Sequence, residues 1–170
     1  MFRMVDLPDD VQGRLFLYRL PGRLEPLQRS IDEIRRRGIS QVICLAPLAE
    51  VEAKSPEYAR LLRNGGTPWR QVMFPIVDYG VPADRQRFLA FVVQVAQSLR
   101  AGDYMLAHCA AGIGRTGLFA AAVLVALGLP MEEAIDRTCA AGSYPERPEQ
   151  VDLVRWIGET AGARTPTHVS

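Results

Sequence analysis

Lysine is nearly missing from this sequence, and so is any excess of one charge. Lys54 is the single lysine among 20 basic residues, which 19 acidic residues almost balance to a net charge of +1. A protein that binds nucleic acid or an anionic membrane through its overall charge carries a strong basic excess. We therefore expect neither nucleic acid nor a membrane as a partner.

Cysteine and histidine are also scarce. The three cysteines, Cys44, Cys109 and Cys139, form no close pair, and the two histidines, His108 and His168, lie far apart. An odd number of widely spaced cysteines argues against a disulfide framework and indicates a reducing compartment. No Cys-x-x-Cys pair or histidine cluster is present to bind a metal ion. We expect no metal and no other cofactor.

Long apolar runs are absent as well. The N-terminus lacks the basic start and apolar run of a signal peptide, and the longest apolar stretch, 118–129, is too short to cross a bilayer. These features predict a cytoplasmic protein. With 170 residues, of which 48% are hydrophobic and 23% charged, the chain suffices for one compact domain.

Apolar periodicity predicts strands that alternate with helices. Short apolar or β-branched runs predict strands at 14–19, 41–46, 69–74 and 104–108. Helical spacing, with Ser55 and Asp84 as N-caps, predicts helices at 24–37, 56–64, 85–100, 115–127, 131–140 and 148–160. This order predicts a single α/β domain with a mostly parallel central sheet of about four to five strands, flanked by helices on both faces. We expect a core over about residues 12–160 and a flexible tail at 161–170.

One loop has the composition of an anion-binding site. It follows the strand at 104–108, and parallel sheets bind ligands beyond the carboxyl ends of their strands. Between Cys109 and Arg115 the residues are small or apolar, so successive backbone N–H groups can point to one centre. The following helix adds the positive end of its dipole. We predict that five loop residues bind phosphate: Ala110, Ala111, Gly112, Ile113 and Gly114.

Side chains at both ends of this loop complete a candidate catalytic site. Arg115 can form a bidentate pair with two phosphate oxygens. The positive field favours the thiolate form of Cys109, which we predict to be the nucleophile. Thr116 is placed to donate a hydrogen bond to the sulfur, and His108 to fix the loop through its ring. No other cysteine is followed by an arginine six positions later.

The string 108–117 resembles the signature HCxxGxxR[ST]G of the protein tyrosine phosphatase superfamily, and every fixed position matches. In size and spacing the chain is most similar to compact atypical dual-specificity phosphatases and their bacterial relatives. The resemblance implies a phosphocysteine intermediate and a mobile upstream loop, whose aspartic acid protonates the leaving oxygen. Residues 75–82 match that loop, so Asp78 is predicted to be the general acid. Asp84 is the alternative, although its position suits a helix cap, and Asp103 is interpreted as structural.

Two further residues match positions that are typical of the family, and one segment of the chain differs from the family pattern. Gln150, at the end of the string 146–150, either orients the water that hydrolyses phosphocysteine or simply starts the last helix. Glu50 resembles a carboxylate that stabilises the loop. Relatives often carry an arginine before the Gly-Ser of the last turn, where this chain has Ala140 and Ala141. The role of that arginine is therefore vacant or taken by Arg147.

The resemblance implies a protein phosphatase that hydrolyses phosphotyrosine, with phosphoserine and phosphothreonine as further candidates. The expected partner is a phosphorylated protein or peptide, and the enzyme is expected to act as a monomer. The first alternative is hydrolysis of phosphoinositides or other small phosphates, which the lack of lysine in the loop disfavours. An arsenate reductase or sulfurtransferase also uses a cysteine in such a loop, but the Cys-to-Arg spacing and the Asp78 loop favour a phosphatase. A binding module without turnover would need a damaged site, and none is visible.

Overall fold

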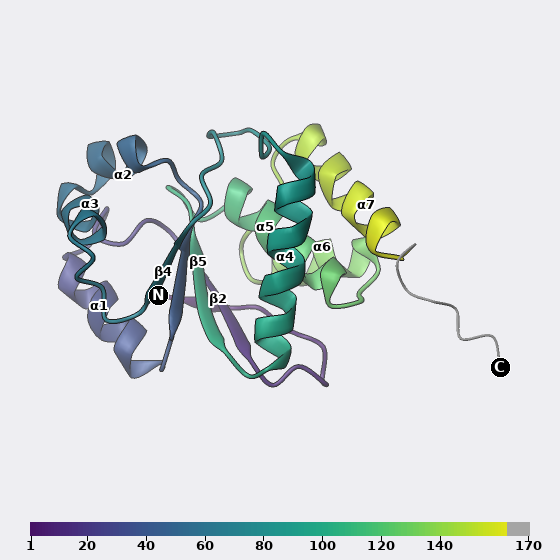
Figure 1. The fold of residues 1–170 in the computed structure, drawn as a ribbon, viewed down its shortest axis with the longest axis horizontal. Helices are drawn as coiled ribbons and strands as arrows, with labels where there is room; N and C mark the ends of the chain where they lie inside the picture. Colours follow the sequence, from purple (N-terminus) through teal and green to yellow (C-terminus); the bar gives the residue numbers. More distant parts are fainter. Residues whose placement is uncertain (163–170) are drawn as a thin grey trace.

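The protein is described from a computed structural model in which residues 1–162 are placed. A five-stranded sheet with the order β1-β2-β5-β3-β4 runs through its centre (Figure 1). All neighbouring strands pair in parallel except β1, which pairs antiparallel with β2. The strands are β1 (Arg3–Met4), β2 (Arg14–Tyr18), β3 (Gln41–Cys44), β4 (Arg70–Met73) and β5 (Tyr104–His108).

Helices cover both faces of this sheet, which confirms the predicted α/β fold (Figure 1). One face carries α1 (Leu27–Arg36), α2 (Leu48–Lys54) and α3 (Pro56–Arg63). The opposite face carries α4 (Arg85–Arg100), α5 (Gly114–Ala126), α6 (Met131–Ala140) and α7 (Pro148–Gly162). On that face α5 lies in the middle and packs against the other three helices.

The alternation of side chains along the strands divides the core into two parts. Leu15 and Leu17 of β2 face the cluster under α4 to α7, whereas Phe16 and Tyr18 face the cluster under α1 and α3. The central helix α5 is apolar on all sides, and every residue from its start to Val125 is buried. Such a helix needs a partner on each side, because burial of apolar surface is the main source of stability.

Two short elements were not predicted. Strand β1 has two residues, too few to show the alternation of apolar and polar side chains that indicates a strand. Phe2 and Val5 on either side of it are nevertheless buried. The packed core therefore begins ahead of residue 12, earlier than the sequence indicated. Helix α2 follows Pro47 and has seven residues. Ser55 is the N-cap residue of α3, as predicted, but its hydroxyl donates to the Pro21 carbonyl and makes no bond to the helix start.

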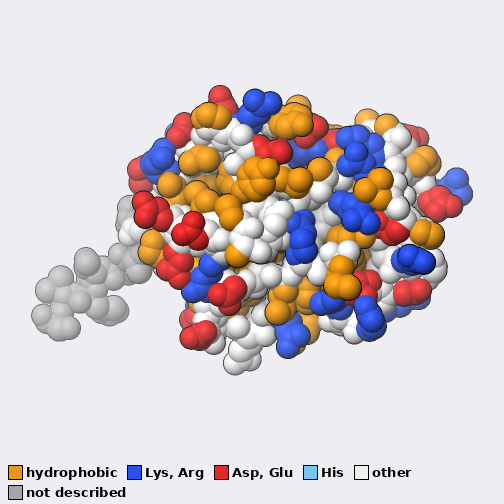
Figure 2. Space-filling view, turned by 180° about the vertical axis from the view of Figure 1, so that it is seen from behind, with side chains coloured by type: hydrophobic (Ala, Val, Ile, Leu, Met, Phe, Trp, Pro, Cys, Tyr) orange, Lys and Arg blue, Asp and Glu red, His pale blue; other side chains and the backbone are white. Residues whose placement is uncertain are grey.

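Helix α7 continues through Gly162, so it includes the first two residues of the predicted tail. The remainder of that tail, 163–170, lies outside the described residues. Within 1–162 no helix combines the length and apolar character needed to cross a bilayer. Basic and acidic side chains are interspersed over the face seen from behind, with apolar side chains exposed between them (Figure 2).

Candidate active site

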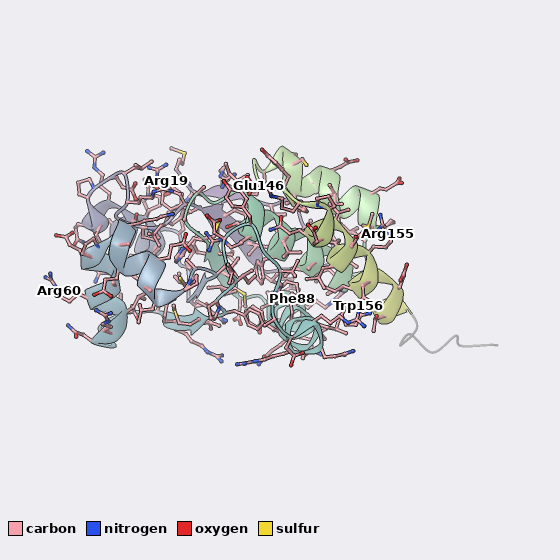
Figure 3. The ribbon with its side chains drawn as sticks, turned by 90° about the horizontal axis from the view of Figure 1, so that it is seen from above. Arg19, Arg60, Phe88, Glu146, Arg155 and Trp156 are labelled. Atoms are coloured by element: carbon pink, nitrogen blue, oxygen red, sulfur yellow. The ribbon has the colours of Figure 1, made fainter. Side chains whose placement is uncertain are left out.

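The predicted anion-binding loop lies at the carboxyl edge of the parallel strands. Strand β5 ends at His108 and helix α5 begins at Gly114, one residue earlier than predicted. We call residues 109–115 the phosphate loop. Figure 3 looks down on this edge of the molecule, where Arg19, after β2, and Glu146, ahead of α7, lie toward the same side. Hydrogen bonds connect the phosphate loop to the segments after β2 and β4: the Leu20 N–H donates to the Ala110 carbonyl, and Arg115 donates to the Ile76 carbonyl.

The sulfur of Cys109 is buried and accepts two hydrogen bonds. The Thr116 hydroxyl donates to Sγ at 3.0 Å, and the Gly112 backbone N–H donates at 3.2 Å. Both donors stabilise negative charge on sulfur, because hydrogen bonds to an ionised acceptor are stronger than those to a neutral one. This arrangement favours a thiolate, which is the nucleophilic form of cysteine.

Gly112 allows the loop to curl around the sulfur. Its φ of +74° is a conformation that residues with a side chain rarely adopt. A Cβ at this position would also lie 2.5 Å from the Tyr18 carbonyl oxygen, so a side chain has no room. The glycine is therefore required by both backbone conformation and close packing against the end of β2.

The Arg115 side chain is 2% exposed and donates hydrogen bonds to helix α2 and to the loop after β4. Its Nη1 and Nη2 atoms donate to the two carboxylate oxygens of Glu50, each at 2.8 Å, and Nη1 also donates to the Ile76 carbonyl. Within residues 1–162 its Nε–H has no hydrogen-bond partner. A buried donor without an acceptor is unfavourable. A phosphate oxygen in the loop would supply the acceptor that this group lacks.

Glu50 is the anchor of this arginine, in agreement with the supporting role that the sequence suggested. The paired Arg115 guanidinium lowers the pKa of Glu50 to about 2 against the opposing effect of burial, and Lys54 contributes in the same direction. Burial disfavours the charge of Arg115, but Glu50 and the anionic groups nearby raise its pKa overall. The guanidinium is thus permanently charged and fixed in orientation.

Residues 75–82, here called the acid loop, bring Asp78 to the same guanidinium. An Asp78 carboxylate oxygen lies 3.1 Å from Nη2 of Arg115 and also accepts the backbone N–H of Tyr79 at 3.1 Å. The Asp78 side chain is 49% exposed, so it is open to solvent on its outer side. Tyr79 has a φ of +59°, which is uncommon for a residue other than glycine. The predicted general acid is therefore adjacent to the predicted phosphate site.

The two other aspartates have different surroundings. Asp84 caps α4, since one of its oxygens accepts the backbone N–H groups of Gln86 and Arg87 at 3.0 Å each. This confirms the predicted cap. Asp103 lies in the turn between α4 and β5, at the opposite end of the sheet from the phosphate loop, and its carbonyl accepts the Arg14 N–H. Neither carboxylate is brought to the phosphate loop.

Gln150 links the start of α7 to the acid loop. Its amide oxygen accepts the backbone N–H groups of Glu146 and Arg147, and its Nε2 donates to the Gly80 carbonyl at 2.9 Å. The side chain is fully buried. Arg147 also reaches the acid loop, because its guanidinium stacks over the Tyr79 ring with 4.8 Å to the centroid. Gln150 thus bonds both to the backbone ahead of α7 and to the acid loop.

The sequence of the phosphate loop and its surroundings places the chain among known proteins. The family model described as the DSP-PTPase phosphatase of polymorphic toxin systems matches residues 18–129, about two thirds of the 170 residues. This chain belongs to the DSP-PTPase phosphatases. The matched segment contains the acid loop, the phosphate loop and α5, but not β1, α6 or α7.

Two viral relatives agree with this assignment. The chain is 30% identical over 102 residues to "Putative tyrosine phosphatase 067L" of Invertebrate iridescent virus 3, a match that covers 58% of this chain and 39% of the relative. It is 29% identical over 92 residues to "Putative tyrosine phosphatase 197R" of Invertebrate iridescent virus 6, covering 52% and 34%. The matches thus span less than half the length of these relatives.

Solved structures share the fold. A kinase associated phosphatase with its catalytic cysteine substituted superposes with a TM-score of 0.80 at 21% identity, covering 96% of each chain. PTPMT1 in complex with PI(5)P gives a TM-score of 0.71 at 22% identity, covering 94% of this chain and 97% of that one. Tk-PTP in its active form gives 0.69 at 23% identity, covering 89% and 97%. This chain therefore shares its fold with these proteins.

His108 of this DSP-PTPase phosphatase connects the phosphate loop to helix α3 through both nitrogens of its ring. Its Nδ1 lies 3.2 Å from the Cys109 carbonyl oxygen, and its Nε2 lies 2.9 Å from the Tyr58 hydroxyl. A carbonyl can only accept, so Nδ1 carries the proton and Nε2 accepts from Tyr58. Tyr58 on α3 is fully buried, and the sequence alone had not indicated it. These two hydrogen bonds together select the neutral imidazole with its proton on Nδ1.

We expect His108 to stay uncharged down to about pH 4. Burial lowers its pKa to about 4, and the charge of Arg115 acts in the same direction, while the bond to the Cys109 carbonyl opposes both. An unfolded histidine titrates near 6.5. The unfolded chain therefore takes up a proton as the pH falls from about 6.5 to about 4 and the folded chain does not, so about 3 kcal/mol of stability is lost across this window.

An NMR titration of the imidazole checks this expectation. The His168→Gln variant leaves His108 as the single histidine, so the signal needs no further assignment. A midpoint near 6.5 would contradict the buried pairing with Tyr58.

Proposed function

We propose that this chain hydrolyses phosphate monoesters through a phosphocysteine intermediate, with phosphotyrosine in proteins or peptides as its preferred substrate. The observation that carries the proposal is the convergence of three groups on one site: a thiolate-stabilising loop, a fixed guanidinium with a free Nε–H, and an aspartate at the edge of both. These are the parts that phosphoryl transfer to sulfur requires.

In the first step the Cys109 thiolate attacks phosphorus, and the bond from phosphorus to the substrate oxygen breaks. The amides of the phosphate loop and the Nε–H of Arg115 hold the nonbridging oxygens as charge moves across them. Asp78 gives its proton to the leaving oxygen. Because Asp78 pairs with Nη2 of Arg115 in the free protein, the incoming phosphate takes over that donor, and the released carboxylate takes up from solvent the proton that it gives to the leaving oxygen.

In the second step water attacks the phosphocysteine, and the bond between sulfur and phosphorus breaks. Asp78, now ionised, accepts the proton of the water. The departing thiolate is stabilised by Thr116 Oγ1 and the Gly112 N–H, the same donors that stabilise it in the free enzyme. Gln150 supports this step by holding the acid loop in place. Its carboxamide bonds to the Gly80 carbonyl of that loop at one end and to the Glu146 N–H ahead of α7 at the other.

The surroundings of the loop support an aromatic or peptide substrate. Val77 and Tyr79 of the acid loop and Tyr144 ahead of α7 are all well exposed apolar side chains. They are available to contact the ring of phosphotyrosine or flanking peptide residues. We further propose that the enzyme acts in the cytoplasm, as a monomer and without a metal ion.

Hydrolysis of an aryl phosphate in the presence of a chelator tests the reaction, and a panel of phosphopeptides and phosphoinositides tests the substrate. We expect turnover that does not depend on metal, with phosphotyrosine peptides hydrolysed faster than phosphoserine or phosphothreonine peptides. Strict metal dependence would contradict the mechanism. Faster hydrolysis of phosphoinositides than of phosphotyrosine peptides would replace the protein substrate with a lipid one.

A further inference from the structure

The Gly112 carbonyl of the phosphate loop is held by two side chains from outside the loop. Nη2 of Arg3 donates to this oxygen at 2.6 Å, and the buried Ser143 hydroxyl donates to it at 2.6 Å. Nη1 of the same arginine donates to the Ala141 carbonyl at 2.9 Å. Arg3 therefore ties the phosphate loop to the turn after α6.

These contacts set the direction of the next amide. The carbonyl of Gly112 and the N–H of Ile113 belong to one planar peptide, and the described chain has no cis peptide bond. The two groups point in opposite directions, so donors that hold the carbonyl outward aim the Ile113 N–H inward, toward the phosphate. Without them this glycine peptide could rotate, because glycine tolerates several backbone conformations.

Strand β1 delivers Arg3 to this position. Arg3 pairs with Leu17 of β2, and Phe2 on its flank is buried with its ring 4.6 Å from that of Tyr18. On the other side Gly142 leaves room for the guanidinium, since a Cβ there would lie 2.6 Å from Nη1. The side chain is thus placed from both directions rather than lying free on the surface.

The charge of Arg3 is also suited to this place. Burial lowers its pKa, and the negative charge of Cys109 opposes that effect. The guanidinium therefore lies within electrostatic reach of the sulfur. Arg147, the residue that the sequence suggested for the turn at Ala140 and Ala141, stacks on Tyr79 instead.

We propose that Arg3 is a positioning residue for the phosphate site, which acts with Ser143 by fixing the Gly112 peptide so that the Ile113 amide faces the bound phosphate. The inference rests on the proposed function, because it assigns a role in the same site. Arg3 and Ser143 both lie outside residues 18–129, the segment that matches the family.

Binding of inorganic phosphate, measured by calorimetry, tests the proposal without turnover. The variants are Arg3→Met, Ser143→Ala and the double variant, with Arg14→Met as the matched control. Arg14 begins the neighbouring strand β2, at the end of the sheet away from the phosphate loop, and its guanidinium lies over the Tyr104 ring. The amide signal of Ile113 and the melting temperature are recorded for each protein.

We expect Arg3→Met to weaken phosphate binding and to lower kcat/KM by about 10- to 100-fold, since loss of one oriented donor has effects of about that size or larger. The phosphate-induced shift of the Ile113 amide should shrink. Ser143→Ala should act in the same direction, and the double variant should show less than the sum of the two effects, because both donors act on one carbonyl. Arg14→Met should bind phosphate as the unmodified chain does.

Two results would overturn the proposal. A lower melting temperature for Arg3→Met with unchanged phosphate affinity would show that Arg3 is merely structural. Additive effects of Arg3→Met and Ser143→Ala would show that they do not act through one peptide. If the unmodified chain hydrolyses no ester but the binding pattern holds, the proposed function fails and the positioning role stands.

Discussion

Replacing Cys109 by serine will abolish hydrolysis, with a fall in kcat of about 10⁴-fold or more. The proposed mechanism needs a sulfur nucleophile: Thr116 and the Gly112 N–H both donate to Sγ, and within the described residues no basic side chain donates a hydrogen bond to it. A serine hydroxyl does not ionise near neutral pH, and nothing here would remove its proton. The measurement is the rate of aryl phosphate hydrolysis in the presence of a chelator.

The chain provides its own control for this substitution. Cys139 on α6 is an exposed free cysteine that takes no part in the site, so Cys139→Ser applies the same chemical change elsewhere. We expect that variant to keep full activity. The Cys109→Ser protein should still bind inorganic phosphate, because the loop amides and Arg115 remain. Appreciable turnover by Cys109→Ser would remove the cysteine from the mechanism.

The conformation of the phosphate loop could be predicted from the sequence because it is determined locally. Its geometry depends on consecutive residues: a cysteine after a strand, a glycine at the position with φ of +74°, and a helix that starts beside the arginine. The conformation of such a short segment is determined mainly by its own residues. The same is true of α5, whose uninterrupted apolar sequence requires burial on all sides.

The supports of that loop could not be predicted, because they join residues that are distant in sequence. Arg3 donates to the carbonyl of Gly112, which lies 109 residues later in the sequence. Tyr58 reaches His108 from α3 on the opposite face of the sheet. Neither residue lies in a motif, and a two-residue strand such as β1 has no periodicity to detect. Only the folded chain brings these groups together.

Gln150 shows why a resemblance alone leaves a role open. The string that contains it predicted two roles, a helix start or a water-orienting group. In the structure one end of the carboxamide satisfies the N–H groups at the start of α7, and the other end bonds to the Gly80 carbonyl. These contacts connect α7 to the acid loop, a link that depends on tertiary packing and not on the string itself. The link holds the loop that carries Asp78, the predicted general acid.

Replacing Asp78 by asparagine should lower kcat by about 10²–10⁴-fold on substrates with a poor leaving group, the usual contribution of a general acid. The effect should be much smaller on an aryl phosphate whose leaving group needs no proton. Asparagine has nearly the shape of aspartate, so the acid loop should keep its fold. The measurement compares kcat for a series of esters with leaving groups of rising pKa.

A second readout separates the acid from a structural or binding role. Asp78 lies 3.1 Å from Nη2 of Arg115, so its negative charge competes with phosphate for that donor. Asp78→Asn should therefore bind inorganic phosphate at least as tightly as the unmodified chain, although it turns over more slowly. Asp84→Asn is the matched control, because asparagine also caps helices well and Asp84 contacts only the start of α4. If Asp84→Asn lost activity on poor leaving groups while Asp78→Asn did not, the proton would come from Asp84, and the Asp78–Arg115 pair would be an ion pair of the free protein alone.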